Sequence, residues 1–510
     1  MQTNHLAPAE GRYPRGRTGV FRRPGVLWTF GRIAGVGGLC LFLVSRLAPD
    51  VRGKALYEDE AIAGLIAMRP LTQVIDTVLV DRGGAPLHFL LAHVAFRIDT
   101  SPETLRLLSV FFALGTVPLC FELGRRLDGA GAGFVAAAVA ASSTALAVYG
   151  SFGRMYALFA FVAALFAVLF VRALDLRTTS AVAAAAAAGW LLPAVHPYGA
   201  IPAFIALVAS AVIWRGRPLR AAWPVAVAVL AAVPLLVADL RLADRAAVGA
   251  GGERSLASPG EAWAELVAAV SAFAGGDGAP LVFCSALALV GVAFLLRSEP
   301  AVAVLALSTL VPPLLFVLVR TDTTPDLSPR HLFYGLPLWA AAIGVGAARL
   351  VAPLGRRVAA VALAGIALVA VVSPASALRD PRNLAFGTTA VGDATGIQAG
   401  NNELLVPYST VFLAALPDVT GAVALPHAPG EEIVRALEHA EAPIAAVHVA
   451  IPTERWTVLR LEGPFDKPEA LAAAADALAD AEHTPRLRKW FAWIEPGLCE
   501  ALRQLHRPCP

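Results

Sequence analysis

The feature that most constrains this chain is a series of apolar stretches, separated by short loops rich in arginine. A helix needs roughly 20 mostly apolar residues to cross the hydrocarbon core of a bilayer. We expect such helices at residues 26–48, 105–124, 131–149, 155–173, 180–197, 199–214, 221–238, 281–296, 300–319, 331–349 and 357–373. The sequence therefore predicts an α-helical polytopic membrane protein with about 11 transmembrane helices, within a range of roughly 10–13.

Composition agrees with a membrane protein and excludes two other classes. Of the 510 residues, 57% are apolar and only 15% are charged. Soluble globular proteins have roughly 45–50% apolar and about 25% charged residues, so a purely soluble enzyme is excluded. A disordered chain is excluded as well, because its signature is low hydrophobicity with high charge. The net charge of +3 is too small to indicate a nucleic-acid partner.

Arginines in the short loops set the expected orientation. Cytoplasmic loops carry an excess of Lys and Arg, and residues 1–25 contain several arginines, so we expect a cytoplasmic N-terminus. The other basic loops alternate onto the same side if 85–98 is a half-helix or interfacial segment. Residues 26–375 then form a multi-pass domain in the cell (inner or plasma) membrane. The first outer loop, 49–104, and a C-terminal domain, 376–510, lie on the extracytoplasmic side.

The last part of the chain differs from the rest. Residues 401–465 have the pattern of short strands and turns, and residues 430–440 and 467–482 have helical character. We therefore expect a small extracytoplasmic α/β domain after the last span. Whether Cys499 and Cys509 pair with each other outside the cell stays open.

Ionisable and aromatic side chains gather at the expected outer ends of the helices. Asp59 and Glu60 follow the first span. They form either a polar loop that only ends the helix or a carboxylate site for a general base. Ionisable groups at membrane depth are rare and usually face a cavity or pathway. The expected topology brings several more to the same face: His88, Arg154, Tyr156, His196, Tyr198 and Arg330.

Six motifs follow one another in a characteristic order. They are an Asp-Glu pair, a Pro-Leu-aromatic opening, an LRL…GRRL stretch, a GRMYAL sequence, a His-Tyr helix end and a late Arg-aromatic-Leu…Pro stretch. In this chain they are Asp59–Glu60, Pro86–Phe89, Arg106–Leu127, Gly153–Leu158, His196–Tyr198 and Arg330–Pro337. Over roughly residues 25–375 this order resembles the C-type membrane glycosyltransferases that use lipid-linked sugars, such as protein O-mannosyltransferases and the aminoarabinose transferase of lipid A. The chain departs from them at Gly84-Ala85, where relatives often have His-Pro, and at Ser151-Phe152, where they often have Gln-Glu.

The resemblance implies a hexosyl- or pentosyltransferase that moves a sugar from a polyprenyl phosphate to an acceptor hydroxyl on the extracytoplasmic face, with inversion. It implies Asp59 as the general base, with Glu60 as helper or substitute. Arg330 and Arg154 suit the donor phosphate, because a guanidinium fork donates two parallel hydrogen bonds. The residues expected to line the cavity are His88, Tyr156, His196 and Tyr198.

Expected partners are the polyprenyl-phosphate-linked sugar, membrane lipid, and a lipid, glycan or protein acceptor. No cofactor is expected, because the ten histidines are scattered without metal-ligand spacing. A divalent ion beside Asp59–Glu60 stays an open alternative. Two other functions also stay open: a non-catalytic envelope-glycan assembly protein of the same fold, and a lipid or glycan transporter. Transporters commonly have internal repeats, and the two halves of this sequence show none.

Overall fold

The computed structural model describes most of the membrane domain and part of the tail. The described ranges are 26–53, 58–67, 70–81, 85–99, 102–213, 259–318 and 329–372, with isolated positions between 227 and 237 and four strands between 404 and 461. Several predictions fall outside these residues. They concern residues 1–25, most of the expected span 221–238, the two expected helices of the tail, and Cys499 and Cys509.

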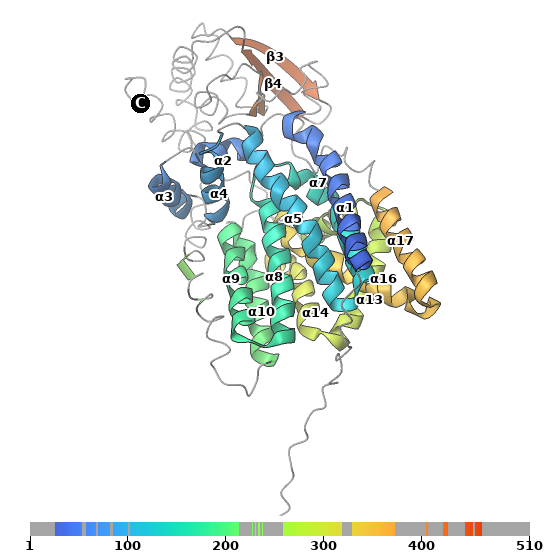
Figure 1. Ribbon diagram of the computed structural model, residues 1–510. Coiled ribbons are helices and arrows are strands. Elements are labelled where there is room, and N and C mark those ends of the chain that lie inside the picture. Colours follow the sequence, from blue (N-terminus) through green and yellow to red (C-terminus); the bar gives the residue numbers. More distant parts are fainter. Residues whose placement is uncertain are drawn as a thin grey trace, which may run out of the picture.

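The described part of the membrane domain is helical (Figure 1). Its first half contains α1 (Val26–Gly53), α2 (Glu58–Ala67), α3 (Leu71–Asp81), α4 (Leu87–Ala95), α5 (Pro102–Asp128), α6 (Ala130–Ser142), α7 (Thr144–Gly150), α8 (Tyr156–Leu176), α9 (Thr179–Val195), the 3-10 helix η1 (Pro197–Gly199) and α10 (Ala200–Ile213). The second half contains α12 (Pro259–Ala274), α13 (Ala279–Ser298), α14 (Pro300–Leu307), η3 (Ser308–Leu310), α15 (Val311–Leu318), η4 (Pro329–Gly335), α16 (Leu336–Val351), η5 (Ala352–Leu354) and α17 (Arg356–Val372).

Several of these helices have the length and composition of membrane spans. Five qualify by themselves: Gly31–Val51, Glu103–Asp128, Tyr156–Leu176, Ala279–Ser298 and Pro329–Leu354. A sixth qualifies if α6 and α7 are taken together across a bend of 56°. The chain is therefore a multi-pass membrane protein. The total of about 11 spans stays a prediction, because the other expected spans are shorter helices or lie outside the described residues.

The structure has two helices where the sequence predicts one span, at 131–149. The break lies at Ser143, whose φ of −53° and ψ of 128° leave the helical region. The Ser143 hydroxyl accepts the backbone N–H of Leu146 as an N-cap and donates to the carbonyl of Ala272 on α12 at 2.9 Å. One serine therefore starts α7 and ties the break to a distant helix. The helices α2, α3 and α12 are further elements that the sequence did not predict.

Small residues bring the central helices together. Helix α6 packs against α5, α16 and α17, and α13 packs against α16. A Cβ atom at Gly291 on α13 would overlap the carbonyl of Ala342, and one at Gly346 on α16 would overlap the carbonyl of Leu287. Helices in a membrane approach closely where such residues replace larger ones.

The described part of the tail is a four-stranded sheet at the end of the bundle where α2 lies (Figure 1). Its strands are β1 (Leu404–Leu405), β2 (Ala422–Pro426), β3 (Ile444–Ile451) and β4 (Glu454–Leu461), in the order β1-β2-β4-β3. Strands β1 and β2 are parallel, and the other two pairs are antiparallel. Strands β3 and β4 correspond to two of the strand segments predicted within 401–465, whereas the α/β character of the domain stays a prediction.

Candidate functional site

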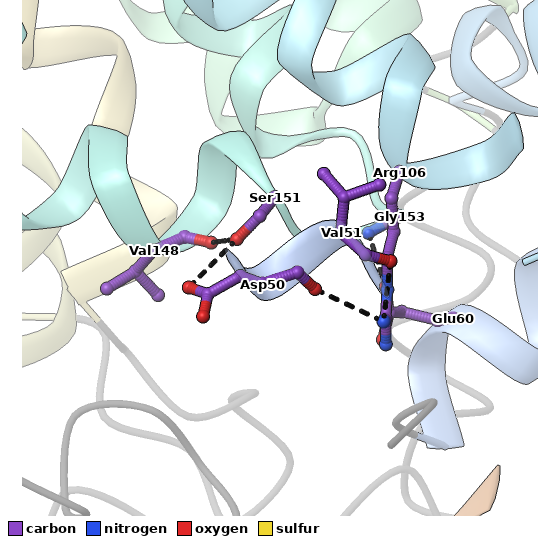
Figure 2. A network of polar contacts seen from close by, with 7 residues as sticks. All are labelled: Asp50, Val51, Glu60, Arg106, Val148, Ser151 and Gly153. Carbon is purple, nitrogen blue, oxygen red and sulfur yellow. Dashed lines mark hydrogen bonds and ion pairs between the residues drawn. The ribbon is translucent and has the colours of Figure 1, made fainter. Parts of the chain in front are cut away.

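Helices α2, α4 and α5 meet a non-helical turn that joins α7 to α8. The turn consists of residues 151–155 and is called the Arg154 turn below. Figure 2 shows Ser151 and Gly153 of this turn beside Asp50 of α1 and Glu60 of α2, which are far apart in the sequence, with Arg106 of α5 bonded to Glu60. The sequence predicted that the same region would hold the outer ends of several helices.

Glu60 on α2 is the centre of this network. It is only 1% exposed, and it accepts two hydrogen bonds from Arg106 of α5, from Nε to Oε1 and from Nη2 to Oε2, both at 3.0 Å. Glu60 Oε1 also accepts the backbone N–H of Gly153 at 2.6 Å. Arg106 Nη1 in turn donates to the carbonyls of Asp50 and Val51 at 3.3 Å (Figure 2). Because a buried carboxylate is stable only when paired and hydrogen-bonded, Arg106 is what allows Glu60 to lie here.

Serine side chains bond the turn to its surroundings. The Ser151 hydroxyl lies 3.4 Å from Asp50 Oδ2 and 3.2 Å from the carbonyl of Val148 (Figure 2). On the other side of Gly153, the hydroxyl of Ser109 on α5 donates to the carbonyl of Arg154 at 3.3 Å. The turn is therefore bonded to α1 and α5 as well as to α2.

His88 on α4 contacts the same turn from another direction. Its side chain is 1% exposed, and its ring lies beside the backbone of Gly153. Burial, and after it the positive charge of Arg154, lowers the pKa of His88 to about 3. The ring is therefore neutral at physiological pH, with one nitrogen a donor and the other an acceptor.

Two arginines from opposite halves of the chain converge beside this turn. The charges of Arg330, on η4, and of Arg154 both act on the buried ring of His196. The guanidinium carbon of Arg330 lies 5.9 Å from the ring centroid of Tyr156, and that of Arg154 lies 5.9 Å from the ring of Phe89. Both distances are within the usual range for a cation over an aromatic face.

An aromatic stack surrounds His196, where α9 ends. The ring of His196 lies 5.0 Å from Phe159, 5.5 Å from Tyr198 and 5.3 Å from His331, between ring centroids. Tyr198 and His331 are themselves stacked at 5.2 Å, and Tyr156 lies 6.1 Å from His196. Elements α8, α9, η1 and η4 are thus joined at one point.

The structure brings the described site candidates into two adjoining groups. Glu60 and His88 meet at Gly153, and the next residue, Arg154, connects them to the group around His196. The second group holds the other predicted residues: Tyr156, Tyr198 and Arg330. The expected general base, Asp59, belongs to α2, but its side chain lies outside the described residues. The roles of all these residues stay predictions.

Sequence reasoning assigned no role to three residues of the site. Arg106 carried a signal, since an arginine inside an apolar helix usually has a partner. His331 was expected beside Arg330 at the end of a span, but without a role of its own. Gly153 lies in the GRMYAL motif, and its bond to Glu60 uses a backbone N–H that nearly every residue has.

The part of the chain that the structure describes contains no set of side chains that could bind a metal ion. No group of three or more His, Cys, Asp or Glu side chains there could hold a metal ion. The acidic pair Asp59–Glu60 is described at Glu60 only, and this carboxylate is bonded to Arg106 and Gly153. An ion beside Asp59 therefore remains an open alternative.

Comparison with known proteins identifies the fold. No protein-family model and no curated protein matches the sequence. The apo crystal structure of ArnT from Cupriavidus metallidurans matches with a TM-score of 0.52 at 14% identity, over 86% of this chain and 99% of ArnT. The structure of the same protein bound to undecaprenyl phosphate matches with a TM-score of 0.50 at 14% identity, over 86% of this chain and all of ArnT (100%). ArnT is a C-type membrane glycosyltransferase. This chain has the C-type membrane glycosyltransferase fold.

The likeness to ArnT extends over 86% of this chain. The fold expected from the order of the motifs is thus confirmed. At 14% identity the C-type fold is what the comparison shows, and the reaction has to be argued from the site.

Proposed function

We propose that this chain is a glycosyltransferase that moves a sugar from a polyprenyl phosphate to an acceptor hydroxyl on the extracytoplasmic face. The observation that carries the proposal is that Arg330 packs over Tyr156, two residues after Arg154. The guanidinium carbon of Arg330 lies 5.9 Å from the Tyr156 ring, and that of Arg154 lies 5.9 Å from the ring of Phe89. A phosphate can accept hydrogen bonds from two arginines at once, because each guanidinium presents a fork of N–H donors. ArnT, which has the same fold, binds undecaprenyl phosphate.

The arginines stabilise the leaving group. In the transfer, the bond between the anomeric carbon of the sugar and the phosphate oxygen breaks, and its electron pair stays on the phosphate. Arg154 and Arg330 donate hydrogen bonds where this negative charge develops. Preorganised donors of this kind are commonly the largest single contribution to catalysis, and arginine donates to phosphate in a bidentate way.

Asp59 is the general base of the proposed reaction. It takes the proton of the acceptor hydroxyl while the acceptor oxygen forms a bond to the anomeric carbon from the face opposite the phosphate, so the product has inverted configuration. The neighbouring residue in α2, Glu60, contacts the Arg154 turn. This contact brings α2 to the site at the residue next to Asp59, which supports Asp59 as a candidate there.

The rest of the chain supplies the surroundings of the reaction. The polyprenyl tail lies between apolar helices, and the C-terminal domain stands on the extracytoplasmic side, where it helps to bind the acceptor. The acceptor is a lipid, glycan or protein. The N-terminus is cytoplasmic, and the membrane is the cell membrane.

The proposal is tested with the full chain in lipid nanodiscs. Labelled polyprenyl-phosphate sugars are the donors, a membrane extract provides acceptors, and release of polyprenyl phosphate is measured. We expect Asp59→Asn to reduce turnover about 10²–10⁴-fold, the usual contribution of a general base. The matched control is Glu58→Gln, which removes the preceding acidic side chain of α2 and should retain turnover.

Two results would contradict the proposal. Release by Asp59→Asn at the wild-type rate would exclude Asp59 as the base. No release by the wild type with any donor would contradict the enzymatic function and favour a non-catalytic assembly protein with this fold.

A further inference from the structure

We propose that Glu60 and His88 form a clamp on Gly153 that positions Arg154 for the donor phosphate. The inference rests on the proposed function and assigns Glu60 a positioning role instead of a role beside the general base. The clamp consists of Glu60, His88 and Arg106, the arginine that pairs with Glu60.

The clamp contacts Gly153 from two sides. Its N–H donates to Glu60 Oε1 at 2.6 Å. The ring of His88, 1% exposed on α4, lies beside the backbone of Gly153. Two buried side chains from α2 and α4 thus restrict the orientation of the residue that precedes Arg154.

The adjoining backbone groups are bonded as well. The N–H of Arg154 donates to the carbonyl of Phe152 at 2.7 Å, and the carbonyl of Arg154 accepts the Ser109 hydroxyl at 3.3 Å. None of these bonds is the i to i−4 bond of an α-helix. The shape of the turn therefore depends on the side chains around it, and helical hydrogen bonding begins only at Met155, whose carbonyl accepts from Phe159 at 2.8 Å.

The bonding of Glu60 favours a positioning role over proton transfer. Both of its oxygens accept from Arg106, and Oε1 also accepts from Gly153. A base must reach the proton that it removes, whereas Glu60 is only 1% exposed and already accepts three hydrogen bonds. Charge-assisted bonds of this kind are about twice as strong as neutral ones, so Glu60 is suited to hold the turn.

The first experiment measures the clamp without any ligand. Amide hydrogen exchange is followed in the full chain in nanodiscs, in peptides that cover residues 151–158. Removing the charge with Glu60→Gln should speed exchange at Gly153 about tenfold, because a hydrogen bond to a charged group is lost or weakened. His88→Leu should also speed exchange in this turn. His88→Asn should restore protection, because its amide nitrogen is as many bonds from the backbone as Nδ1.

The second experiment asks whether the clamp acts through Arg154. The affinity for undecaprenyl phosphate is measured for the wild type, Glu60→Gln, Arg154→Gln and the double variant. We expect Glu60→Gln alone to weaken binding about tenfold, from loss of one well-placed charge-assisted bond, and to add nothing in the Arg154→Gln background. The matched control is Glu122→Gln on α5, since Glu122 pairs with Arg125 and Arg126 away from the site.

The outcomes separate the clamp from the proposed function. Unchanged exchange in Glu60→Gln, or a binding loss that adds fully to that of Arg154→Gln, would overturn the clamp. A wild type that does not bind undecaprenyl phosphate would contradict the proposed function, and the exchange data would still report whether Glu60 and His88 hold Gly153. If Glu60→Gln does not fold, the comparison of His88→Leu with His88→Asn decides.

Discussion

Replacing Arg106 with glutamine should destabilise this protein far more than replacing another arginine of the same helix. The side chains of Arg106 and Glu60 are only 4% and 2% exposed, and their closest atoms are 3.0 Å apart. Breaking a buried ion pair costs about 3–5 kcal/mol, because the remaining charge stays buried without a partner. The two longer bonds from Arg106 to the carbonyls of Asp50 and Val51, at 3.3 Å, contribute less, so we expect a total near this range.

The control for this prediction lies further along α5. Arg125 pairs with Glu122 at 2.6 Å, but these side chains are 30% and 27% exposed. Solvated pairs contribute about 0–1 kcal/mol. Arg125→Gln should therefore lower the free energy of unfolding by no more than about 1 kcal/mol, although the same chemical group is removed.

Unfolding in mixed micelles with increasing SDS provides the assay, because the nine tryptophans give a fluorescence signal. The free energy of unfolding is compared for the wild type, Arg106→Gln, Arg125→Gln and the double variant Glu60→Gln/Arg106→Gln. The double variant removes both charges of this pair. It should therefore lower the free energy of unfolding by less than the sum of the two single changes. The reasoning is refuted if Arg106→Gln costs no more than Arg125→Gln, or if the double variant costs the full sum.

Three further predictions concern pH, phosphate binding and packing. The pKa of His88 is lowered from 6.5 to about 3, so between these values the unfolded chain binds a proton that the native chain does not. The free energy of unfolding should therefore fall as the pH falls through this window, by up to about 1.4 kcal/mol per pH unit. Its dependence on pH should be weaker in His88→Asn, which unfolding titrations at several pH values would measure. Arg330→Gln should weaken undecaprenyl phosphate binding about tenfold or more, and Arg330→Lys should recover part of the loss; equal binding by all three proteins would exclude Arg330 from the phosphate site. Gly346→Leu should lower the free energy of unfolding by more than about 1 kcal/mol, because its side chain would overlap the carbonyl of Leu287; an unchanged SDS midpoint would contradict the packing of α13 on α16.

Much of the membrane domain could be predicted because span length is set by the bilayer. Expected spans at 105–124 and 155–173 correspond to α5 and α8, and their ends differ from the structure by a few residues. The short helix α4 lies within the expected half-helix, 85–98. The candidates that the structure brings together could be selected because ionisable groups at the ends of apolar helices are rare.

The remaining features depend on contacts that leave no pattern in the sequence. The break at Ser143 depends on the carbonyl of Ala272, which is brought close only by folding, so an apolar run with one serine is predicted as continuous. The pairing of Glu60 with Arg106 joins two helices that are separate in the sequence. The clamp on Gly153 uses backbone groups that every residue except proline has, and no residue type reveals it.

The close packing around Gly153 also restricts which substitutions this chain can accept during evolution. A Cβ atom at position 153 would lie 2.9 Å from Leu105 Cδ2 and 3.0 Å from Glu60 Oε1. The end of the Leu105 side chain can shift, whereas Glu60 Oε1 is held by Arg106 and by the N–H of Gly153. A side chain at 153 therefore has to find its room on the side of residue 105, so these two positions should vary together among close homologues.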